Sequence, residues 1–342
     1  MKKKILVTGG TGYIGSHTSV ELIEEGFDVV IVDNLYNSEA EVIDGIEKIT
    51  GIRPSFEVFD LCDKDRSALF FKNNNDIAAI IHFAAYKAVG ESVNKPLEYY
   101  RNNLVSLLNL LDSMKIYGVG NIVFSSSCTV YGQPEKLPVT EEAPFQTALS
   151  PYGNTKQICE EIIRDTTVSS DKINAISLRY FNPIGAHPSA LIGELPRGVP
   201  ENLVPYITQT AIGLRDELKV FGDDYDTPDG SCIRDYLHVS DLAKAHVIAV
   251  KRLIEKKNKE HYEVFNLGTG NGVSVLEAIH SFEKVSGVKL KYKITGRRQG
   301  DIVKIWADPS RATRELGWKT MYSLDDCMKT AWEWEKQIRK NN

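Results

Sequence analysis

The stretch that most constrains the fold lies near the start of the chain, where a short apolar run leads into three evenly spaced glycines. The run is Ile5-Leu6-Val7, and the sequence after the glycines predicts a helix to about Glu25, closed by Gly26. The glycines are Gly9, Gly12 and Gly15. A second apolar run, 29–32, ends at Asp33. Short apolar runs that end in glycine are typical of buried parallel strands, so this segment predicts a β-α-β unit.

The glycine spacing has a physical consequence for ligand binding. It is Gly-x-x-Gly-x-x-Gly rather than the Gly-x-Gly-x-x-Gly of the dehydrogenase fingerprint, but it meets the same needs. Glycines permit a tight turn and a close approach of the backbone to a pyrophosphate, which the following helix N-terminus attracts. A carboxylate at Asp33 suits a ribose hydroxyl pair and repels a 2′-phosphate. The order strand, turn, helix, strand, acid therefore favours an NAD site over the alternative of a plain turn.

Strand-like and helical stretches alternate through the first half of the chain. The predicted strands are 56–59, 77–83, 121–125 and 175–178, and the predicted helices are roughly 64–73, 97–117 and 152–167. Such alternation predicts an α/β fold with a Rossmann-type, doubly wound parallel sheet. Ligands bind at the carboxyl ends of strands in these sheets. The segments expected there are Asp60-Leu61, 83–87 and 125–127, although the serines of the last segment are equally explained as loop caps.

A candidate reactive pair follows in the segment from Ser150 to Lys156. Serine followed by proline predicts a helix start, which places Tyr152 and Lys156 one turn apart on one face. A phenol has an ordinary pKa of ~10, and a cation within ~4–6 Å favours its ionised form. A tyrosine so paired can take a proton from an alcohol while hydride leaves the same carbon. By itself the pair is more typical of an ordinary amphipathic helix with an exposed Tyr and Lys, and the rest of the chain is what favours the catalytic interpretation.

Composition excludes several classes of protein. The 342 residues carry a formal charge of −5, which argues against a nucleic-acid-binding surface. The 5 cysteines are scattered and odd in number, so we expect a reducing compartment, no disulfide framework and no structural zinc. The 7 histidines form no metal-ligand motif. The longest apolar stretch, 77–85, is too short to span a bilayer, and we expect a soluble, cytoplasmic protein.

The second half of the chain is predicted to contain more irregular structure than the first. A proline- and glycine-rich excursion over 180–205 predicts a long irregular loop, and such loops are usually functional. Further predicted elements are a helix over 206–214, a strand at 219–221, a helix opening at 239–241, a strand at 263–267, a helix from the capping box at Ser274 to about Val285, and a last short helix between Pro309 and Gly317. Arginines at 234, 297 and 298 are candidates for holding a diphosphate, the alternative being surface salt bridges.

Several motifs together resemble those of extended short-chain dehydrogenase/reductases. They are Gly9 to His17, His82 to Ala85, Ser125 to Ser127, Ser150 to Lys156 and Leu178 to Pro183. More narrowly, other stretches resemble the UDP-glucose 4-epimerase family. They are Lys87 to Val93, Asn182 to Ser189, Val220 to Tyr225 and Arg234 to Val239. The resemblance covers nearly the whole chain.

The resemblance implies an NAD-binding Rossmann domain of seven strands and a smaller C-terminal α/β domain that binds a UDP-sugar. The first would span 1–180 with about 237–267, and the second would span 181–236 and 268–342. It also implies a homodimer whose interface pairs the 97–117 and 152–167 helices of each subunit. Neither nucleic acid nor membrane is expected as a partner.

The same resemblance implies roles for individual residues. NAD would contact Gly9, Gly12, Tyr13, Ile14, Gly15, Asp33, Asn34, Asn37, Ser38, Asp60, Leu61, Phe83, Ala84, Lys87, Asn102, Tyr152, Lys156 and Phe181. The UDP-sugar would contact Lys87, Ser127, Tyr152, Asn182, Asn202, Leu203, Phe221, Arg234, Arg298, Asp301 and Ile305. Tyr152 would be the base, Ser127 would support the reacting hydroxyl and Lys156 would bind the nicotinamide ribose. No metal is implied.

The implied reaction interconverts UDP-galactose and UDP-glucose, as a step of galactose metabolism, through transient oxidation at sugar C4. One alternative is a nucleotide-sugar 4,6-dehydratase or decarboxylase. A dehydratase of this kind carries Asp-Glu after its catalytic hydroxyl residue, whereas here Cys128-Thr129 follows Ser127. A second alternative, from another class, is a non-catalytic dinucleotide sensor, which would not need both Tyr152 and Lys156.

Three positions depart from the family pattern. Cys128 replaces the usual alanine, Asn154-Thr155 stands where Lys-Ser is frequent, and Ile305 stands where some members have a tyrosine against the sugar. Isoleucine is shorter than tyrosine but β-branched and stiff. We therefore expect slower activity on UDP-N-acetylhexosamines beside the main UDP-hexose pair. The alternative is that Ile305 faces the protein interior and does not influence which sugars are accepted.

Overall fold

The computed structural model describes residues 2–298 and 302–340 and divides into two compact units. Unit 1 combines Met1–Gly132, Pro144–Arg179 and Ala243–Phe265, and unit 2 combines Gln133–Ala143, Tyr180–Leu242 and Asn266–Asn342. The segment 133–143 differs from the predicted division, which assigned it to the first domain. It groups with unit 2 because the Val139 carbonyl accepts hydrogen bonds from Asp308 N at 2.7 Å and Asn266 Nδ2 at 2.9 Å.

Unit 1 is built on a seven-stranded sheet in the order β11-β6-β5-β4-β1-β2-β3. The strands are β1 Lys4–Thr8, β2 Asp28–Asp33, β3 Ser55–Val58, β4 Ile77–His82, β5 Asn121–Ser127, β6 Asn174–Tyr180 and β11 Tyr262–Leu267. The pairings β1–β2, β1–β4, β2–β3 and β4–β5 are parallel. The central strands are apolar on both faces, as a sheet covered by helices requires. The predicted Rossmann-type α/β fold is confirmed.

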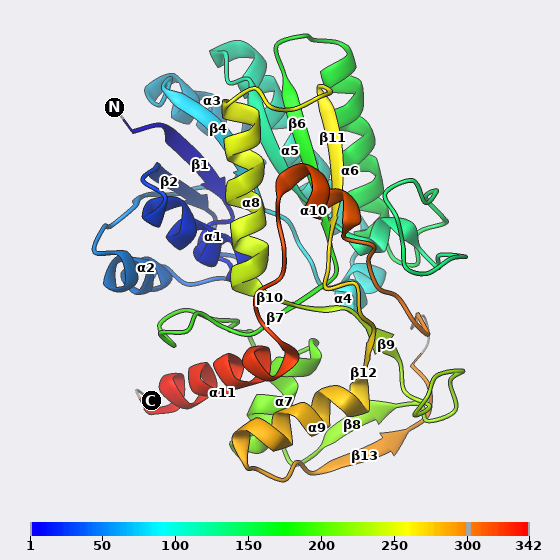
Figure 1. The fold of residues 1–342 in the computed structure, drawn as a ribbon. Helices are drawn as coiled ribbons and strands as arrows, with labels where there is room; N and C mark the ends of the chain where they lie inside the picture. Colours follow the sequence, from blue (N-terminus) through cyan, green and yellow to red (C-terminus); the bar gives the residue numbers. More distant parts are fainter. Residues whose placement is uncertain (1, 299–301, 341–342) are drawn as a thin grey trace. The chain divides into compact units, whose positions relative to one another are not determined.

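Helices connect these strands. They are α1 Tyr13–Glu24, α2 Val42–Thr50, α3 Lys64–Asn73, α4 Val89–Asn94, α5 Pro96–Tyr117, α6 Pro151–Val168 and α8 Val239–Ile254, with a 3₁₀ turn η1 at Cys128–Tyr131. Figure 1 shows α8 running in front of the sheet, on the side opposite α5. The predicted helices 64–73, 97–117 and 152–167 are confirmed within one residue at each end. Sequence reasoning did not identify α2 and α4.

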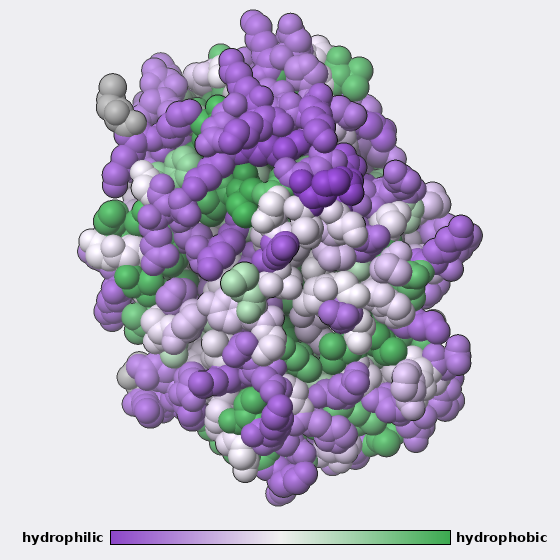
Figure 2. All heavy atoms as spheres, viewed as in Figure 1, coloured by the Kyte–Doolittle hydropathy of each residue, from purple (hydrophilic) through white to green (hydrophobic). Residues whose placement is uncertain are grey.

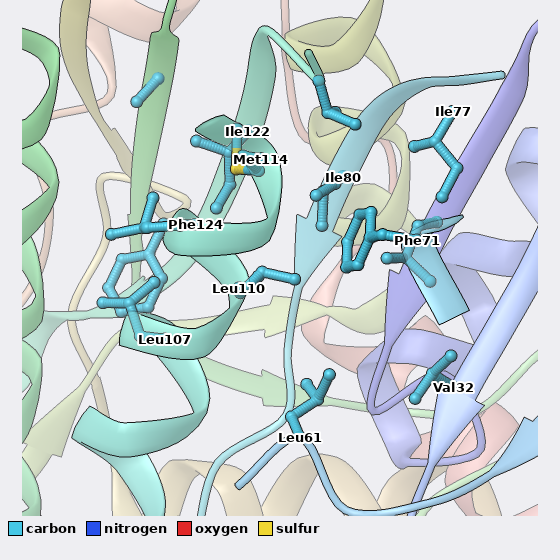
Figure 3. Close-up of a cluster of buried hydrophobic side chains, with 14 of the residues drawn as sticks. Val32, Leu61, Phe71, Ile77, Ile80, Leu107, Leu110, Met114, Ile122 and Phe124 are labelled. Atoms are coloured by element: carbon cyan, nitrogen blue, oxygen red, sulfur yellow. The ribbon is translucent and has the colours of Figure 1, made fainter. Parts of the chain in front are cut away.

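One hydrophobic core of unit 1 lies between the sheet and helices α3, α5 and α6. Figure 3 shows Leu107, Leu110 and Met114 of α5 beside Ile80 and Phe124 of the sheet. Each of these five side chains is at most 1% exposed. This packing holds the helices against the sheet.

Unit 2 contains shorter elements. They are β7 Asn182–Ile184, α7 Leu203–Ala211, β8 Leu218–Phe221, β9 Ile233–Arg234, β10 Tyr236–His238, β12 Val273–Ser274, α9 Val275–Ser286, β13 Tyr292–Thr295, α10 Ser310–Leu316 and α11 Leu324–Lys340. Its strands form three pairs, β10–β7, β12–β9 and β13–β8. The predicted capping box is confirmed, because Ser274 Oγ accepts from Glu277 N and Glu277 Oε2 accepts from Ser274 N.

Two expectations for unit 2 were wrong. The helix expected over 206–214 begins three residues earlier and ends at Ala211, before Gly213 at φ +86°. The helix after Pro309 is not the last, because α11 follows it with Cys327, Met328, Ala331 and Glu335 on its buried face. That spacing of i, i+1, i+4 and i+8 was available in the sequence as the signal of an amphipathic helix.

The surface agrees with the composition. Among the residues that the structure describes, no helix is both long enough and apolar enough to cross a bilayer. The face in Figure 2 carries mostly hydrophilic residues, with apolar residues in small separate groups.

Candidate active site

The glycine loop between β1 and α1 lies so close to other backbone atoms that it has no room for a side chain at Gly9 or Gly15. Gly9 has φ +69°, and a Cβ there would lie 2.7 Å from Ala84 N. A Cβ at Gly15 would lie 2.3 Å from the Gly9 carbonyl oxygen. Both distances are far below van der Waals contact, so the loop can exist only with glycine at these positions. Gly12 caps α1, whose first amides and dipole suit a phosphate group.

Asp33 joins this loop to the turn that follows β2. Its Oδ2 accepts from Thr11 N at 3.2 Å, and its Oδ1 accepts from Leu35 N at 2.9 Å and Ser38 Oγ at 3.2 Å. The carboxylate is therefore fixed at the carboxyl end of the strand, directly beside the glycine loop. Asn34 and Asn37 are exposed in the same turn. Asn34 Nδ2 donates to Asp60 Oδ2 at 3.2 Å, so the predicted residues after β2 and after β3 also meet.

The loop after β4, which carries Phe83, Ala84 and Lys87, is held by a residue of α5 to which the sequence assigned no role. Asn103 on α5 accepts from Tyr86 N at 2.8 Å and donates to Tyr86 O at 3.1 Å and to Thr155 Oγ1 at 3.0 Å. Thr155 Oγ1 in turn donates to the Tyr152 carbonyl oxygen at 2.7 Å. Asn103 thus connects the Lys87 loop to the first turn of α6. Its neighbour Asn102, a predicted NAD contact, donates to the Asn103 side chain at 3.0 Å.

Helix α6 carries the predicted reactive pair. Ser150 caps it by accepting from Gly153 N at 3.1 Å, as the sequence indicated. Lys156 is buried, and its Nζ donates to the Ser125 carbonyl oxygen at 2.8 Å. That nitrogen lies 4.8 Å from the centre of the Phe124 ring and 5.9 Å from the centre of the Tyr152 ring. One ammonium therefore joins the end of β5 to the turn that bears the tyrosine.

Burial lowers the pKa of the Lys156 ammonium to about 8, while electrostatic interactions with Cys159 and Glu160 oppose the fall. His82, at the end of β4, is also fully buried, and burial followed by the charge of Lys156 lowers its pKa to about 3. His82 is therefore neutral at physiological pH, where its ring Nδ1 lies 2.8 Å from Thr8 Oγ1. The cation that faces the tyrosine ring is thus Lys156.

Ser127 lies at the start of η1, where its Oγ accepts from Thr129 N at 3.2 Å. This is the loop-capping role that the sequence left open as an alternative. Because the bond uses the oxygen as acceptor, the same hydroxyl can still donate to a ligand. A Cβ on Gly153 would lie 3.4 Å from Thr129 Cβ, so η1 packs against the residue after Tyr152.

A buried ion pair supports the same face of α6 and was not predicted. Glu160, one turn beyond Lys156, accepts from Ser126 Oγ at 2.5 Å and from Arg179 Nη2 at 2.6 Å. Lys156 and Glu160 therefore bind successive residues of β5. The spacing of four residues after Lys156 was a sequence signal for this alignment.

The predicted sugar-nucleotide residues are arranged within unit 2. Arg298 lies 5.4 Å over the Phe221 ring, whereas Arg297 pairs with Asp224 at 2.8 Å and lies over Tyr225. The surface salt bridge left open by the sequence is thus found for Arg297. A hollow of about 430 Å³ lies beside Arg297, between the residues that follow β8 and β13.

Other predicted residues of unit 2 lie on short elements and loops. Asn182 begins β7 and Arg234 ends β9. Asn202 occupies the N-cap position of α7 without a side-chain cap bond, and its Nδ2 donates to Glu194 Oε1 at 2.6 Å. Phe181 is buried, and its amide donates to the Leu267 carbonyl oxygen at 3.3 Å. Ile305 is 2% exposed, and its amide donates to the Ile233 carbonyl oxygen at 3.2 Å. Asp301 lies outside the described residues. Across the described ranges, no cluster of three His, Cys, Asp or Glu side chains is arranged to hold a metal.

Comparison with known proteins shows similarity over nearly the whole chain. The model of the family described as GDP-mannose 4,6 dehydratase matches residues 6–331. The UDP-glucose 4-epimerase of Bacillus subtilis is 50% identical over 97% of this chain and 96% of its own, and that of Bos taurus is 48% identical over 98% and 97%. The crystal structure of the Stenotrophomonas maltophila UDP-glucose 4-epimerase, with bound NAD and formylated UDP-arabinopyranose, has a TM-score of 0.96 at 47% identity and covers 99% of this chain and 100% of its own. With such identity over nearly its whole length, the chain belongs to the UDP-glucose 4-epimerase family of extended short-chain dehydrogenase/reductases.

Proposed function

We propose that this protein is an NAD-dependent isomerase that interconverts UDP-galactose and UDP-glucose by inverting sugar C4. The observation that carries the proposal is the set of contacts that the Lys156 side chain makes. Its buried ammonium binds the Ser125 carbonyl oxygen at 2.8 Å and faces the Tyr152 ring. This arrangement places a cation, a phenol and the serine-rich end of β5 together at the carboxyl edge of the sheet.

The residues of unit 1 fit NAD. The loop of Gly9 and Gly15 has no room for a Cβ, which is the condition for close approach to a pyrophosphate. Asp33 would accept hydrogen bonds from the adenosine ribose, and its charge disfavours a 2′-phosphate. Asp60, Phe83 and Lys87 follow the ends of β3 and β4. When bound, NAD supplies transient acceptance of hydride from sugar C4.

Tyr152 is the proposed general base and acid. The Lys156 ammonium favours its phenolate form, which takes the proton of the C4 hydroxyl and later returns it. Ser127 donates to the same sugar oxygen and so orients it. Because one residue both removes and returns the proton, inversion at C4 needs no second acid. The 4-keto sugar turns over between the two proton transfers while its diphosphate stays held.

The residues of unit 2 would hold the sugar nucleotide. Arg234 and Arg298 are proposed to bind the diphosphate, because guanidinium groups bind such oxygens in a bidentate manner. Phe221, stacked under Arg298, offers an apolar ring face to the uracil. Asn182, Asn202, Leu203 and Asp301 are proposed as further contacts.

Ile305 is proposed to limit which sugars are accepted. It is smaller than tyrosine, so it leaves room toward a 2-acetamido group, but its β-branch restricts movement. A clash in a packed site typically costs ~1–3 kcal/mol, which slows a substrate without excluding it. We therefore infer slow epimerisation of UDP-N-acetylglucosamine beside the main reaction.

We also infer a cytoplasmic homodimer that acts in galactose metabolism. Leu97 and Leu108 lie three turns apart on one stripe of α5 and are exposed in the single chain. Burial of such a stripe against a second copy would remove apolar surface from water. All five cysteines are free thiols, in keeping with a reducing compartment. Sedimentation of the purified protein tests the dimer.

The decisive experiment needs no added cofactor. Purified protein is incubated with UDP-galactose, and the product is identified by chromatography and NMR. We expect UDP-glucose, with Tyr152→Phe as the inactive control. Absence of turnover by protein shown to contain NAD would instead support the dinucleotide-sensing alternative.

A further inference from the structure

Asp235 is a fully buried carboxylate in unit 2. It lies between the end of β9 and the start of β10. Its Oδ1 accepts from Thr269 N at 2.8 Å and Thr269 Oγ1 at 2.7 Å. Its Oδ2 accepts from Ala307 N at 3.1 Å and Gly270 N at 3.3 Å. These donors are three backbone amides and a hydroxyl, so the carboxylate acts as a junction between three chain segments. Burial raises the pKa of the Asp235 carboxyl, and the four bonds oppose that rise.

The glycine-rich turn after β11 is shaped around this carboxylate. A Cβ on Gly268 would lie 2.3 Å from Asp235 Oδ2 and 2.7 Å from Ala307 Cβ. A Cβ on Gly272 would lie 2.5 Å from Ile233 Cγ2 and 2.9 Å from Trp306 Cε3. The Thr269 and Gly270 amides of this turn are therefore occupied by an internal anion.

The segment that Asp235 holds carries Ile305. Backbone bonds tie it to β9, because Ile233 N donates to the Val303 carbonyl oxygen at 2.9 Å and Ile305 N to the Ile233 carbonyl oxygen at 3.2 Å. Beyond Ile305, the bond from Ala307 N to Asp235 fixes the segment through a side chain. Asp235 directly follows Arg234, the proposed diphosphate contact. It therefore links Arg234 to the segment that carries Ile305, the proposed sugar contact.

We propose that Asp235 is a positioning residue that sets sugar selectivity by holding the Ile305–Ala307 segment against β9. The proposal rests on the proposed function and adds to it. With the carboxylate in place, Ile305 stays at a fixed distance from Arg234, and the room beside the sugar ring is limited. Without the bond to Ala307, the segment can move away and admit a 2-acetamido group more easily.

Asp235→Asn perturbs one side of the junction selectively. The two bonds from Thr269 are shorter than those from Ala307 and Gly270, so the remaining oxygen should stay with Thr269. The new amide nitrogen then faces the Ala307 and Gly270 N–H groups, and donor faces donor. Thr269→Val is the matched control, because it removes a hydroxyl bond to the same carboxylate without touching the Ala307 bond.

The measurement is the ratio of kcat/KM for UDP-N-acetylglucosamine to kcat/KM for UDP-galactose. The ratio is independent of the fraction of folded enzyme, so loss of stability alone cannot change it. We expect a rise of at least fivefold in Asp235→Asn and a change of less than twofold in Thr269→Val. A ratio within twofold of wild type in folded Asp235→Asn would overturn the proposal, whereas failure of wild type to turn over UDP-galactose would overturn the proposed function instead.

Two further variants complete the test. If Asp235→Asn does not fold, Ala307→Gly loosens the same segment while keeping the carboxylate, and an unchanged ratio there overturns the proposal equally. In an Ile305→Ala background, Asp235→Asn should change the ratio less than twofold, since the residue through which it acts is gone. An equal effect in both backgrounds would refute the route through Ile305.

Discussion

Replacement of Lys156 by methionine should stabilise the cofactor-free protein at neutral pH while abolishing most of its activity. Burial lowers the pKa of the Lys156 ammonium from its ordinary 10.5 to about 8. At about 1.4 kcal/mol per pKa unit, keeping this ammonium charged in the folded state costs about 3 kcal/mol. Methionine has similar length and no charge, so it avoids this cost.

The substitution also has a cost of its own. The Ser125 carbonyl oxygen loses its donor, and an unmade buried hydrogen bond costs roughly 1 kcal/mol. We therefore expect Lys156→Met to exceed wild type by about 2 kcal/mol in free energy of unfolding at pH 7. Turnover should fall by a factor on the order of 10²–10⁴, because the cation that favours the phenolate is lost.

The pH dependence gives a second, independent check. Between the folded pKa of about 8 and the unfolded 10.5, the unfolded wild-type chain binds the lysine proton and the folded chain does not, so wild-type stability rises with pH. The advantage of Lys156→Met is thus full below pH 8, shrinks and changes sign within this window, and becomes a deficit of roughly 1 kcal/mol above it. Groups that do not interact with Lys156 titrate alike in both proteins and cancel in the difference.

The assay is urea unfolding followed by circular dichroism from pH 7 to pH 10.5, with both proteins stripped of cofactor because bound ligand adds stability. Lys115→Met, at an exposed position on α5, is the control and should differ from wild type by less than about 0.5 kcal/mol at every pH. A Lys156→Met protein less stable than wild type at pH 7 would refute the reasoning, as would a difference that does not vary with pH.

Three further predictions concern the proposed site. Tyr152→Phe should lower turnover by roughly 10²–10⁴-fold while NAD and UDP-sugar affinities measured by calorimetry stay nearly unchanged, and a near-normal rate would show that Tyr152 is not the base. Acid release of cofactor from the purified protein should yield NAD rather than NADP, and Asp33→Ala should weaken that preference; mainly NADP in the wild type would contradict the role of Asp33. Ile305→Tyr should remove activity on UDP-N-acetylglucosamine and spare UDP-galactose, and Ile305→Ser should raise it, whereas equal ratios in all three proteins would mean that Ile305 does not contact the sugar.

The sequence by itself determined the features that depend on near neighbours in the chain. The glycine unit from Gly9 to Gly15 predicts its own turn, because the steric need for glycine is local. Ser150 and Pro151 predict where α6 begins, and the 3.6-residue period then puts Tyr152 and Lys156 on one face. The alternation of apolar runs predicted the doubly wound sheet for the same reason.

The tertiary structure decided which polar groups meet across long separations. Lys156 donates to a carbonyl oxygen 31 residues earlier in the chain. Asn103 joins Tyr86, which lies 17 positions before it, to Thr155, which lies 52 positions after it. Arg297 and Arg298 are equivalent in sequence, yet one pairs with Asp224 and the other stacks on Phe221. Only the paths of the loops after β8 and β13 separate them.

Asp235 shows the limit most clearly. In sequence it is an acid beside an arginine, which predicts a surface ion pair as readily as a buried junction. Its own segment and its two partner segments are separated from one another by more than thirty residues and meet only after β9, the glycine turn and the 303–308 segment have folded together. Burial and donor geometry are properties of that assembly, so no local pattern in the chain encodes them.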